Sequence, residues 1–260
     1  MRDEDIFPAA LAEFFGPLAL VFAGAGAIIL TQGQDILAIA LAHGLAIGLM
    51  IMALGHISGG HFNPAVTISM LATGRIGLNN AVAYLVAQLL GGLAGAALLT
   101  LTYPALIDEA TGVTVGRNNV NLGTPGVGAG ATITQALIME VILTFFLVFV
   151  IFGVAVDRRS GKAVAGLCIG LTITMDILAG GVISGAAMNP ARWFGPAVVQ
   201  QDFTNFWVWI VGPIAGGLIA AFAYQTLFLS GAPETVEEVV EDAVAARVAA
   251  GQQAAKRRRK

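Results

Sequence analysis

Six long runs of apolar residues constrain this chain more than any other feature of its sequence. A helix needs about 20 mostly apolar residues to cross the hydrocarbon core of a bilayer. The six runs cover about Ile6–Leu30, Ile36–Ile57, Asn80–Leu101, Thr132–Val156, Ala163–Ile183 and Phe203–Leu229. The chain is 57% hydrophobic and 11% charged, whereas soluble domains are about 45–50% apolar and about 25% charged. We therefore expect an all-α membrane protein with six transmembrane helices.

The lysines and arginines indicate how these spans are oriented. Six spans place both ends of the chain on one side of the membrane, and cytoplasmic loops are enriched in Lys and Arg. Only Arg117 and Arg192 fall on the side opposite to the termini. The terminal side holds Arg2, Arg75, Arg158, Arg159, Lys162, Arg247 and the cluster Lys256–Lys260. We therefore predict a multi-pass protein with cytoplasmic termini, in the cell (plasma) membrane.

Residues 1–229 are predicted to form the membrane domain and residues 230–260 a cytoplasmic tail. Within the tail, PETVEEVVEDAVAARVAA has apolar residues at helical spacing and an acidic first turn. This pattern favours a short amphipathic helix, and a solvated basic tail is the alternative. The closing KRRRK favours an anionic membrane surface. We expect no binding of nucleic acid.

The membrane domain contains an internal repeat, at about 6–101 and about 132–229. AEFFGPLALVFAGAG parallels MEVILTFFLVFVIFG, and each segment carries one glutamate near its start, Glu13 or Glu140. Gly-x-x-x-Gly pairs, which favour close helix packing, recur at 44/48, 91/95, 166/170 and 212/216. Each half has three spans, so the second half must be inserted upside down. Such inverted repeats place broken helices and binding sites near the bilayer midplane.

The tripeptide Asn-Pro-Ala occurs once in each half, at Asn63, Pro64 and Ala65 and at Asn189, Pro190 and Ala191. Asn is a preferred N-cap, and Pro at the first helical position costs no hydrogen bond. Each tripeptide therefore predicts a short helix, over about 64–73 and 190–199. Irregular backbone within the bilayer must be buried in protein or line water. Two half-helices that enter from opposite faces would point their positive ends at one spot.

The two loops around these tripeptides resemble the signature loops of the aquaporins, the major intrinsic protein family. The loops read SGGHFNPAVT and SGAAMNPARWFGPA, and the resemblance extends over about 7–229. It implies an hourglass fold with six spans and two half-helices, one pore per subunit, and a homotetramer. It also implies a passive channel for water that excludes protons and ions, with an Arg and the half-helix dipoles as the barrier.

The resemblance further implies a selectivity filter of His43, Ile177, Ala186 and Arg192. This set is similar to the filter of plant tonoplast intrinsic proteins, which are associated with ammonia, urea and hydrogen peroxide as well as water. Those proteins often add a histidine from the third loop, which this chain lacks, and this weakens the expectation for ammonia. Glycerol channels usually have Asp after Asn-Pro-Ala-Arg, where this chain has Trp193. Glycerol is therefore not expected as the main solute.

The remaining candidates are expected to support the pore. His61 resembles a pore-lining residue on the cytoplasmic side, and Glu13 and Glu140 resemble carboxylates that hold loop amides. Carboxylates inside spans are also a mark of coupled transport, so a proton- or ion-coupled secondary transporter of a small solute is the alternative. We expect no catalytic residue, no cofactor and no metal site; the partners expected are water, small neutral solutes and the lipid bilayer.

Overall fold

A computed structural model describes residues 6–105, 116–160 and 162–230 of the chain. Contacts divide the chain into two units, residues 1–224 and residues 225–260. The described part of the first unit contains helices, turns and loops, and no strand. The predicted amphipathic tail helix and the basic cluster lie outside the described residues. The same is true of Arg2 and Arg247.

Six helices are long and apolar enough to cross a membrane, which confirms the predicted fold class. The spans are Ile6–Thr31, Ile36–Ser58, Leu78–Thr102, Ile133–Val156, Lys162–Ser184 and Val208–Leu229. Five begin and end close to the predicted limits. The sixth begins at Val208 instead of Phe203, because Asn205 takes a left-handed backbone (φ 52°) that interrupts a helix. The residues before Val208 form turns.

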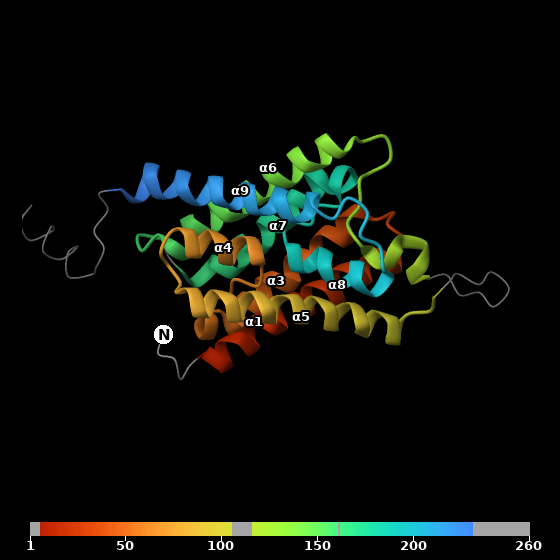
Figure 1. Cartoon of the computed structure of the whole chain (residues 1–260), viewed down its shortest axis with the longest axis horizontal. Helices are drawn as coiled ribbons and strands as arrows, with labels where there is room; N and C mark the ends of the chain where they lie inside the picture. Colours follow the sequence, from red (N-terminus) through yellow and green to blue (C-terminus); the bar gives the residue numbers. More distant parts are fainter. Residues whose placement is uncertain (1–5, 106–115, 161, 231–260) are drawn as a thin grey trace, which may run out of the picture. The chain divides into compact units, whose positions relative to one another are not determined.

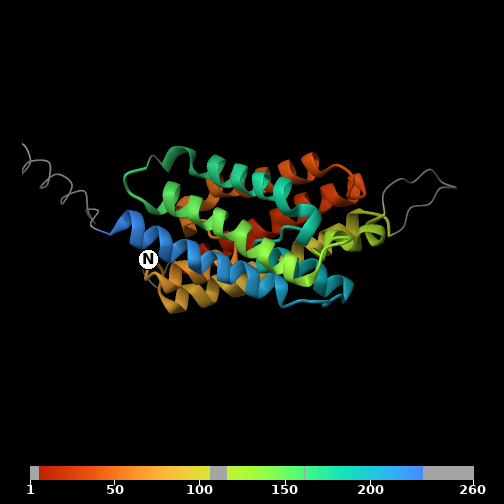
Figure 2. The same ribbon diagram turned by 90° about the horizontal axis from the view of Figure 1, so that it is seen from above.

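Several spans combine more than one type of helix. The first consists of α1 (Ile6–Leu20), the π-helix η2 (Val21–Ala25) and α2 (Gly26–Thr31). The second and third are α3 (Ile36–Ser58) and α5 (Leu78–Thr102). In the second half the elements are α6 (Ile133–Ile151) with η4 (Phe152–Val156), η5 (Lys162–Val164) with α7 (Ala165–Ser184), and α9 (Val208–Tyr224) with η6 (Gln225–Leu229). The long α-helices of the first unit run side by side in Figures 1 and 2.

Two short helices follow the Asn-Pro-Ala tripeptides, as predicted. The first is α4 (Pro64–Ala72) and the second is α8 (Pro190–Gln200). Asn63 and Asn189 are their N-caps, and each side-chain oxygen accepts a hydrogen bond from the helix's own first turn. α4 and α8 lie on either side of the middle of the helical bundle (Figure 1).

Glycine pairs allow the long helices to pack closely, as the Gly-x-x-x-Gly spacing predicts. Gly44 and Gly48 of α3 face Gly170 and Gly166 of α7, and a Cβ at Gly48 would lie 2.9 Å from the Gly166 carbonyl oxygen. In the same way, Gly91 of α5 packs on the backbone of α1, and Gly216 of α9 packs on the backbone of α6. α3 and α7 are thus held at a backbone distance that leaves no room for a side chain between them.

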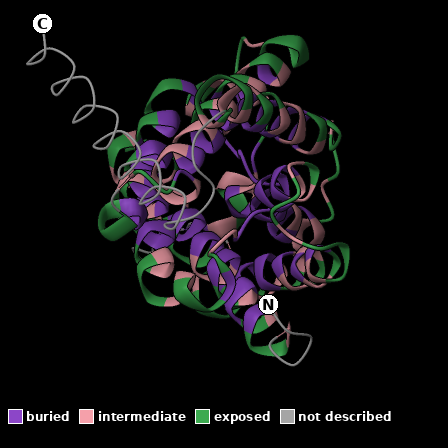
Figure 3. Cartoon of the chain, turned by 90° about the vertical axis from the view of Figure 1, so that its left-hand side faces the viewer, coloured by how far each residue is buried: buried purple, intermediate pink, exposed green. Residues whose placement is uncertain are grey.

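Burial in the first unit follows the pattern of a membrane protein. Exposed residues lie on the outer side of the helices and buried residues on the inner side (Figure 3). The exposed residues include large apolar side chains such as Phe7, which is 74% exposed. Glu13, Gln88, Glu140 and Arg192 are buried. The polar interior enclosed by an apolar exterior is where a site for polar molecules can lie.

Candidate functional site

The two tripeptides meet in the interior of the first unit. Asn63 Nδ2 donates to the carbonyl oxygen of Met188 at 2.8 Å, and Asn189 Nδ2 donates to that of Phe62 at 2.9 Å. Each asparagine of one half therefore bonds to the loop of the other half. Because a primary amide has two N–H groups, each asparagine keeps one more donor. Both asparagines line the same cavity.

Glu140 holds the second loop by three hydrogen bonds. Its Oε1 accepts from Ser184 Oγ at 2.8 Å and from the Ala187 amide at 2.8 Å. Its Oε2 accepts from the Met188 amide at 2.7 Å. Buried amides need partners, and the carboxylate supplies them where the loop has no regular structure. Met188 itself takes a positive φ of 51°, a conformation that the surrounding bonds must maintain.

Glu13 holds the first loop in the same manner. Its Oε1 accepts from Ser58 Oγ at 2.7 Å and from the His61 amide at 2.8 Å. Its Oε2 accepts from the Phe62 amide at 2.6 Å, and from Gln88 Nε2 at 2.7 Å. The two repeats thus place equivalent carboxylates under equivalent loops, with all four carboxylate oxygens occupied by donors.

Arg192 lies at the start of α8 and is 2% exposed. Its Nη1 donates to the Gly123 carbonyl oxygen at 2.9 Å. Its Nε and Nη2 lie 3.3 Å and 3.1 Å from His43 Nε2. The guanidinium is therefore fixed on one side by the loop that contains Gly123 and on another by α3. A fixed cation with buried donors repels other cations and orients neutral polar molecules.

Two cavities meet at the predicted filter residues. One cavity contains both asparagines and His61, and the other lies against the loop at Gly123 and Pro125. His43, Ile177 and Arg192 line both cavities, and Ala186 lines the first. A residue that lines both cavities lies at the boundary between the two. The first cavity is thus lined by all four predicted filter residues and by His61.

Trp193 and Asp176 line neither of these two cavities. Trp193 stacks on Trp209, with ring centroids 6.0 Å apart and an interplanar angle of 6°. Trp193 packs in a buried apolar cluster with Trp209 and with Ala187 of the second loop. Asp176 is 1% exposed, and its Oδ2 has no hydrogen-bond partner among the described residues; nothing in the structure explains why a carboxylate lies there.

Some residues that build the site were not identified from the sequence. Ser58 and Ser184 each open their loop and bond to the glutamate, and the repeated Ile-Ser-Gly at 57–59 and 183–185 was a usable signal. Gly123 had no such signal, because it acts through its carbonyl oxygen. Among the described residues, no group of three or more His, Cys, Asp or Glu side chains could hold a metal ion.

The sequence profile of the family described as Major intrinsic protein matches residues 1–224. Aquaporin NIP1-1 of Zea mays is 39% identical over 227 residues, which cover 86% of this chain and 76% of that protein. Lens fiber major intrinsic protein of Oryctolagus cuniculus is 41% identical over 232 residues, which cover 87% of this chain and 83% of that protein. Nodulin-26 of Glycine max is 37% identical over 227 residues, which cover 86% and 79%.

A solved structure shares the fold. The X-ray structure of the aquaglyceroporin from Plasmodium falciparum superposes with a TM-score of 0.73 at 25% sequence identity. The superposition covers 85% of this chain and 96% of that one. The likeness therefore extends over most of both chains, not over one motif alone.

Proposed function

Because this chain belongs to the major intrinsic protein family, whose members are passive channels and not enzymes, we propose that it conducts water along a path through the two cavities described above. Ammonia, urea and hydrogen peroxide are the further solutes proposed, and protons and ions are excluded. The observation that carries the proposal is the crossing of Asn63 and Asn189 between two half-helices, next to the buried Arg192.

The barrier to cations follows from the charges around that crossing. The N-terminus of a helix carries a partial positive charge of roughly half a unit, and α4 and α8 both begin at the crossing. Arg192 adds a full positive charge in the same buried region. A neutral water molecule can accept hydrogen bonds from the free N–H groups of Asn63 and Asn189. A hydronium ion or a metal cation would meet these positive charges, and neither Glu13 nor Glu140 lines the two cavities to bind it there.

The solute range is proposed from the filter alone. His43, Ile177, Ala186 and Arg192 form a set similar to that of plant tonoplast intrinsic proteins, whereas over its length the chain is similar to Aquaporin NIP1-1 and Nodulin-26. Ile177 and Ala186 add apolar surface to the cavity that Arg192 also lines. Such a filter offers its hydrogen-bond donors at Arg192, which suits small neutral molecules with a lone pair.

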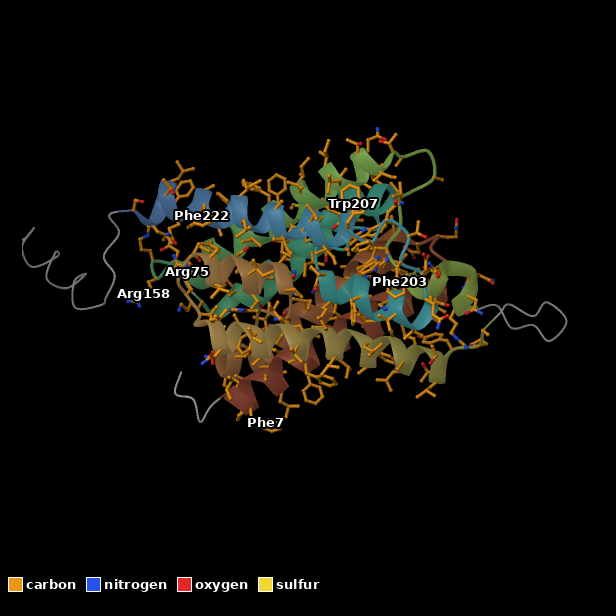
Figure 4. The ribbon with its side chains drawn as sticks, viewed as in Figure 1. Phe7, Arg75, Arg158, Phe203, Trp207 and Phe222 are labelled. Atoms are coloured by element: carbon orange, nitrogen blue, oxygen red, sulfur yellow. The ribbon has the colours of Figure 1, made fainter. Side chains whose placement is uncertain are left out.

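We also propose the assembly and the orientation that the family resemblance implied. The exposed apolar side chains of the first unit suit both lipid and neighbouring subunits of a homotetramer. Arg75 and Arg158 lie at the same end of that unit, and Trp207 lies toward the other (Figure 4). This sidedness supports cytoplasmic termini, and we propose the plasma membrane as the location. Residues 1–229 are proposed as the channel domain and 230–260 as its cytoplasmic tail.

Stopped-flow light scattering on proteoliposomes tests the channel. Water should leave the vesicles faster than from empty liposomes, with a low activation energy and no proton current. His43→Phe should lower ammonia and urea flux more than water flux, because the larger ring narrows the filter. Equal losses would contradict the proposed solute range, and no acceleration over empty liposomes would contradict the channel itself.

The alternative is a coupled secondary transporter that uses Glu13 or Glu140. A coupled carrier needs a carboxylate that can exchange its proton or ion during the cycle. Every oxygen of both glutamates accepts a loop amide or a side-chain donor, an arrangement that suits a permanent brace. Solute flux that depends on a proton gradient would favour the transporter.

A further inference from the structure

The two histidines along the proposed path differ in which ring nitrogen is engaged. In His43, Nε2 lies 3.1 Å from Nη2 and 3.3 Å from Nε of Arg192. A guanidinium can only donate hydrogen bonds, so Nε2 of His43 must be the acceptor. The proton of the neutral ring then sits on Nδ1 and is donated to the Ile39 carbonyl oxygen at 2.8 Å. Both nitrogens of His43 are thus occupied.

In His61 the contact itself leaves the tautomer open. Nδ1 lies 3.1 Å from Thr67 Oγ1, and a hydroxyl can donate or accept. The other bond of that hydroxyl decides between the two. Gln88 Nε2 lies 2.8 Å from Thr67 Oγ1 and donates to it. Thr67 is fully buried, so its own proton needs an acceptor, and His61 Nδ1 is the available one among the described residues.

The orientation of the Gln88 amide is set by Glu13. Gln88 Nε2 lies 2.7 Å from Glu13 Oε2, and a reversed amide would place its oxygen against that carboxylate. Glu13 Oε2 also accepts the Phe62 amide at 2.6 Å, which identifies it as an acceptor. The chosen orientation leaves Gln88 Oε1 buried without a partner among the described residues. The hydrogen bond from Gln88 to the charged carboxylate of Glu13 therefore contributes more free energy than is lost by leaving the Gln88 amide oxygen without a partner.

We infer that a hydrogen-bond relay from Glu13 through Gln88 and Thr67 holds His61 in the tautomer with its proton on Nε2. Gln88 donates to Glu13 and to Thr67, and Thr67 donates to His61 Nδ1. Gln88 and Thr67 are positioning residues that act through His61. The two histidines of the path are thus held in opposite tautomers.

This inference rests on the proposed function, because in a channel the Nε2–H group of His61 can donate a hydrogen bond to a passing water molecule or solute. His61 lines the same cavity as both asparagines, and its Nε2 has no hydrogen-bond partner among the described residues. The side chains facing that cavity then offer N–H donors at His61, at the asparagines and at Arg192. His43 offers neither a donor nor an acceptor. These side chains can therefore bind solutes that accept hydrogen bonds.

Nitrogen NMR of the histidine rings tests the relay without any transport assay. The chain has three histidines, so protein labelled with ¹⁵N-histidine in lipid bilayers gives few ring signals, assigned with His56→Gln and His43→Phe. At mildly alkaline pH, His61 should show a protonated Nε2 and a bare Nδ1, and His43 the reverse. A proton on Nδ1 of His61 would overturn the inference.

Two variants separate the links of the relay. Thr67→Val keeps the shape and removes the hydroxyl, so the Nε2–H to Nδ1–H ratio of His61 should fall about fivefold, the factor for one ordinary hydrogen bond. Thr67→Ser should restore the ratio, and His43 should not change. Gln88→Met keeps the Thr67 hydroxyl but removes the donor to it. The hydroxyl can then accept a hydrogen bond from Nδ1–H of His61, so the Nε2–H to Nδ1–H ratio of His61 should fall by a similar factor.

Each outcome of these variants decides one point. An unchanged His61 spectrum in Thr67→Val would overturn the whole relay, and an unchanged spectrum in Gln88→Met would overturn its upstream half. The spectrum does not depend on flux. If the stopped-flow assay shows no water flux, the proposed channel is contradicted, but the NMR result on the tautomers still stands. If the NMR spectra show the other tautomer of His61, the relay is contradicted, but the proposed channel still stands.

Discussion

Gly24 shows how a single missing side chain positions the filter. It lies in the π-helix η2, and a Cβ at this position would overlap the imidazole ring of His43. π-helical turns inside α-helices are frequent at functional sites. The first span thus contributes to the filter by leaving space. The ring of His43 occupies that space and stays within reach of Arg192.

Gly24→Ala is expected to displace the ring of His43 and to break its bond with Arg192. Overpacking of a filled interior costs about 1–3 kcal/mol, and the displaced ring would enter the path, so water flux in stopped flow should fall several-fold. Gly26→Ala is the matched control, because a Cβ there would first meet the Tyr103 hydroxyl at an ordinary 3.4 Å. Equal effects of the two substitutions would contradict this role of Gly24.

At the scale of elements, the crossing of α3 and α7 determines how far apart the two halves lie. Gly170 packs on the backbone of α3, and a Cβ there would lie 2.5 Å from the Gly44 carbonyl oxygen. Backbone atoms cannot move aside as a flexible side chain can. Ile177, which is two turns along the same helix, lines the path. The packing of α3 on α7 therefore also sets the width of the filter between His43 and Ile177.

Gly170→Val should separate α3 from α7 and lower the free energy of unfolding by about 1–3 kcal/mol, because the added methyl groups cannot be accommodated. Leu171→Val is the control, since Leu171 is on the same helix and 54% exposed. Thermal unfolding in detergent measures both variants. A Gly170→Val protein as stable as the Leu171→Val protein would argue against close packing at this crossing.

At the scale of the whole membrane unit, a buried carboxylate ties the end of the fourth span to the sixth. Asp157 follows η4 directly, and its Oδ2 accepts from Arg159 Nη2 at 2.6 Å and from the Tyr224 hydroxyl at 3.2 Å. Asp157 Oδ1 accepts from Arg159 Nε at 2.9 Å. The hydrogen bond from Arg159 lowers the pKa of Asp157 from 3.8 to about 2.

This lowered pKa predicts a loss of stability in acid. Since the pKa of the carboxyl is lower in the folded state, its contribution is complete above about pH 4 and is lost as the pH falls toward 2. Asp157→Asn should remove this part of the pH dependence. Unfolding temperatures in detergent between these two pH values, compared with the unsubstituted protein, measure the difference; parallel curves would contradict the prediction.

The sequence predicted most of the fold because the signals are local. A run of about 20 apolar residues spans a bilayer wherever it lies, and Asn before Pro begins a helix by its own chemistry. The spans and both half-helices were therefore found within a few residues. The start of the last span was placed five residues too early, since the aromatic residues before Val208 look apolar while Asn205 turns the backbone.

The bonds of the site could be predicted only in part. Glu13 and Glu140 stood out because a charge inside a span is rare, and Arg192 because it follows Asn-Pro-Ala directly. Gly123, Gly24 and Gln88 did not stand out. A carbonyl oxygen, an absent side chain and a neutral amide leave no mark in a sequence, and their effect depends on what lies opposite them.

By itself, the sequence determined that this chain crosses a membrane six times, that its halves are inverted copies, and that two short helices begin at Asn63 and Asn189. Each of these follows from forces that act over a few consecutive residues. Only the tertiary structure decided that Arg192 binds His43, 149 residues away, and that Gln88 connects Glu13 to Thr67. Which donor faces which acceptor depends on the distance between neighbouring helices. That distance is set by glycines on both helices of a pair, which lie far apart in the sequence.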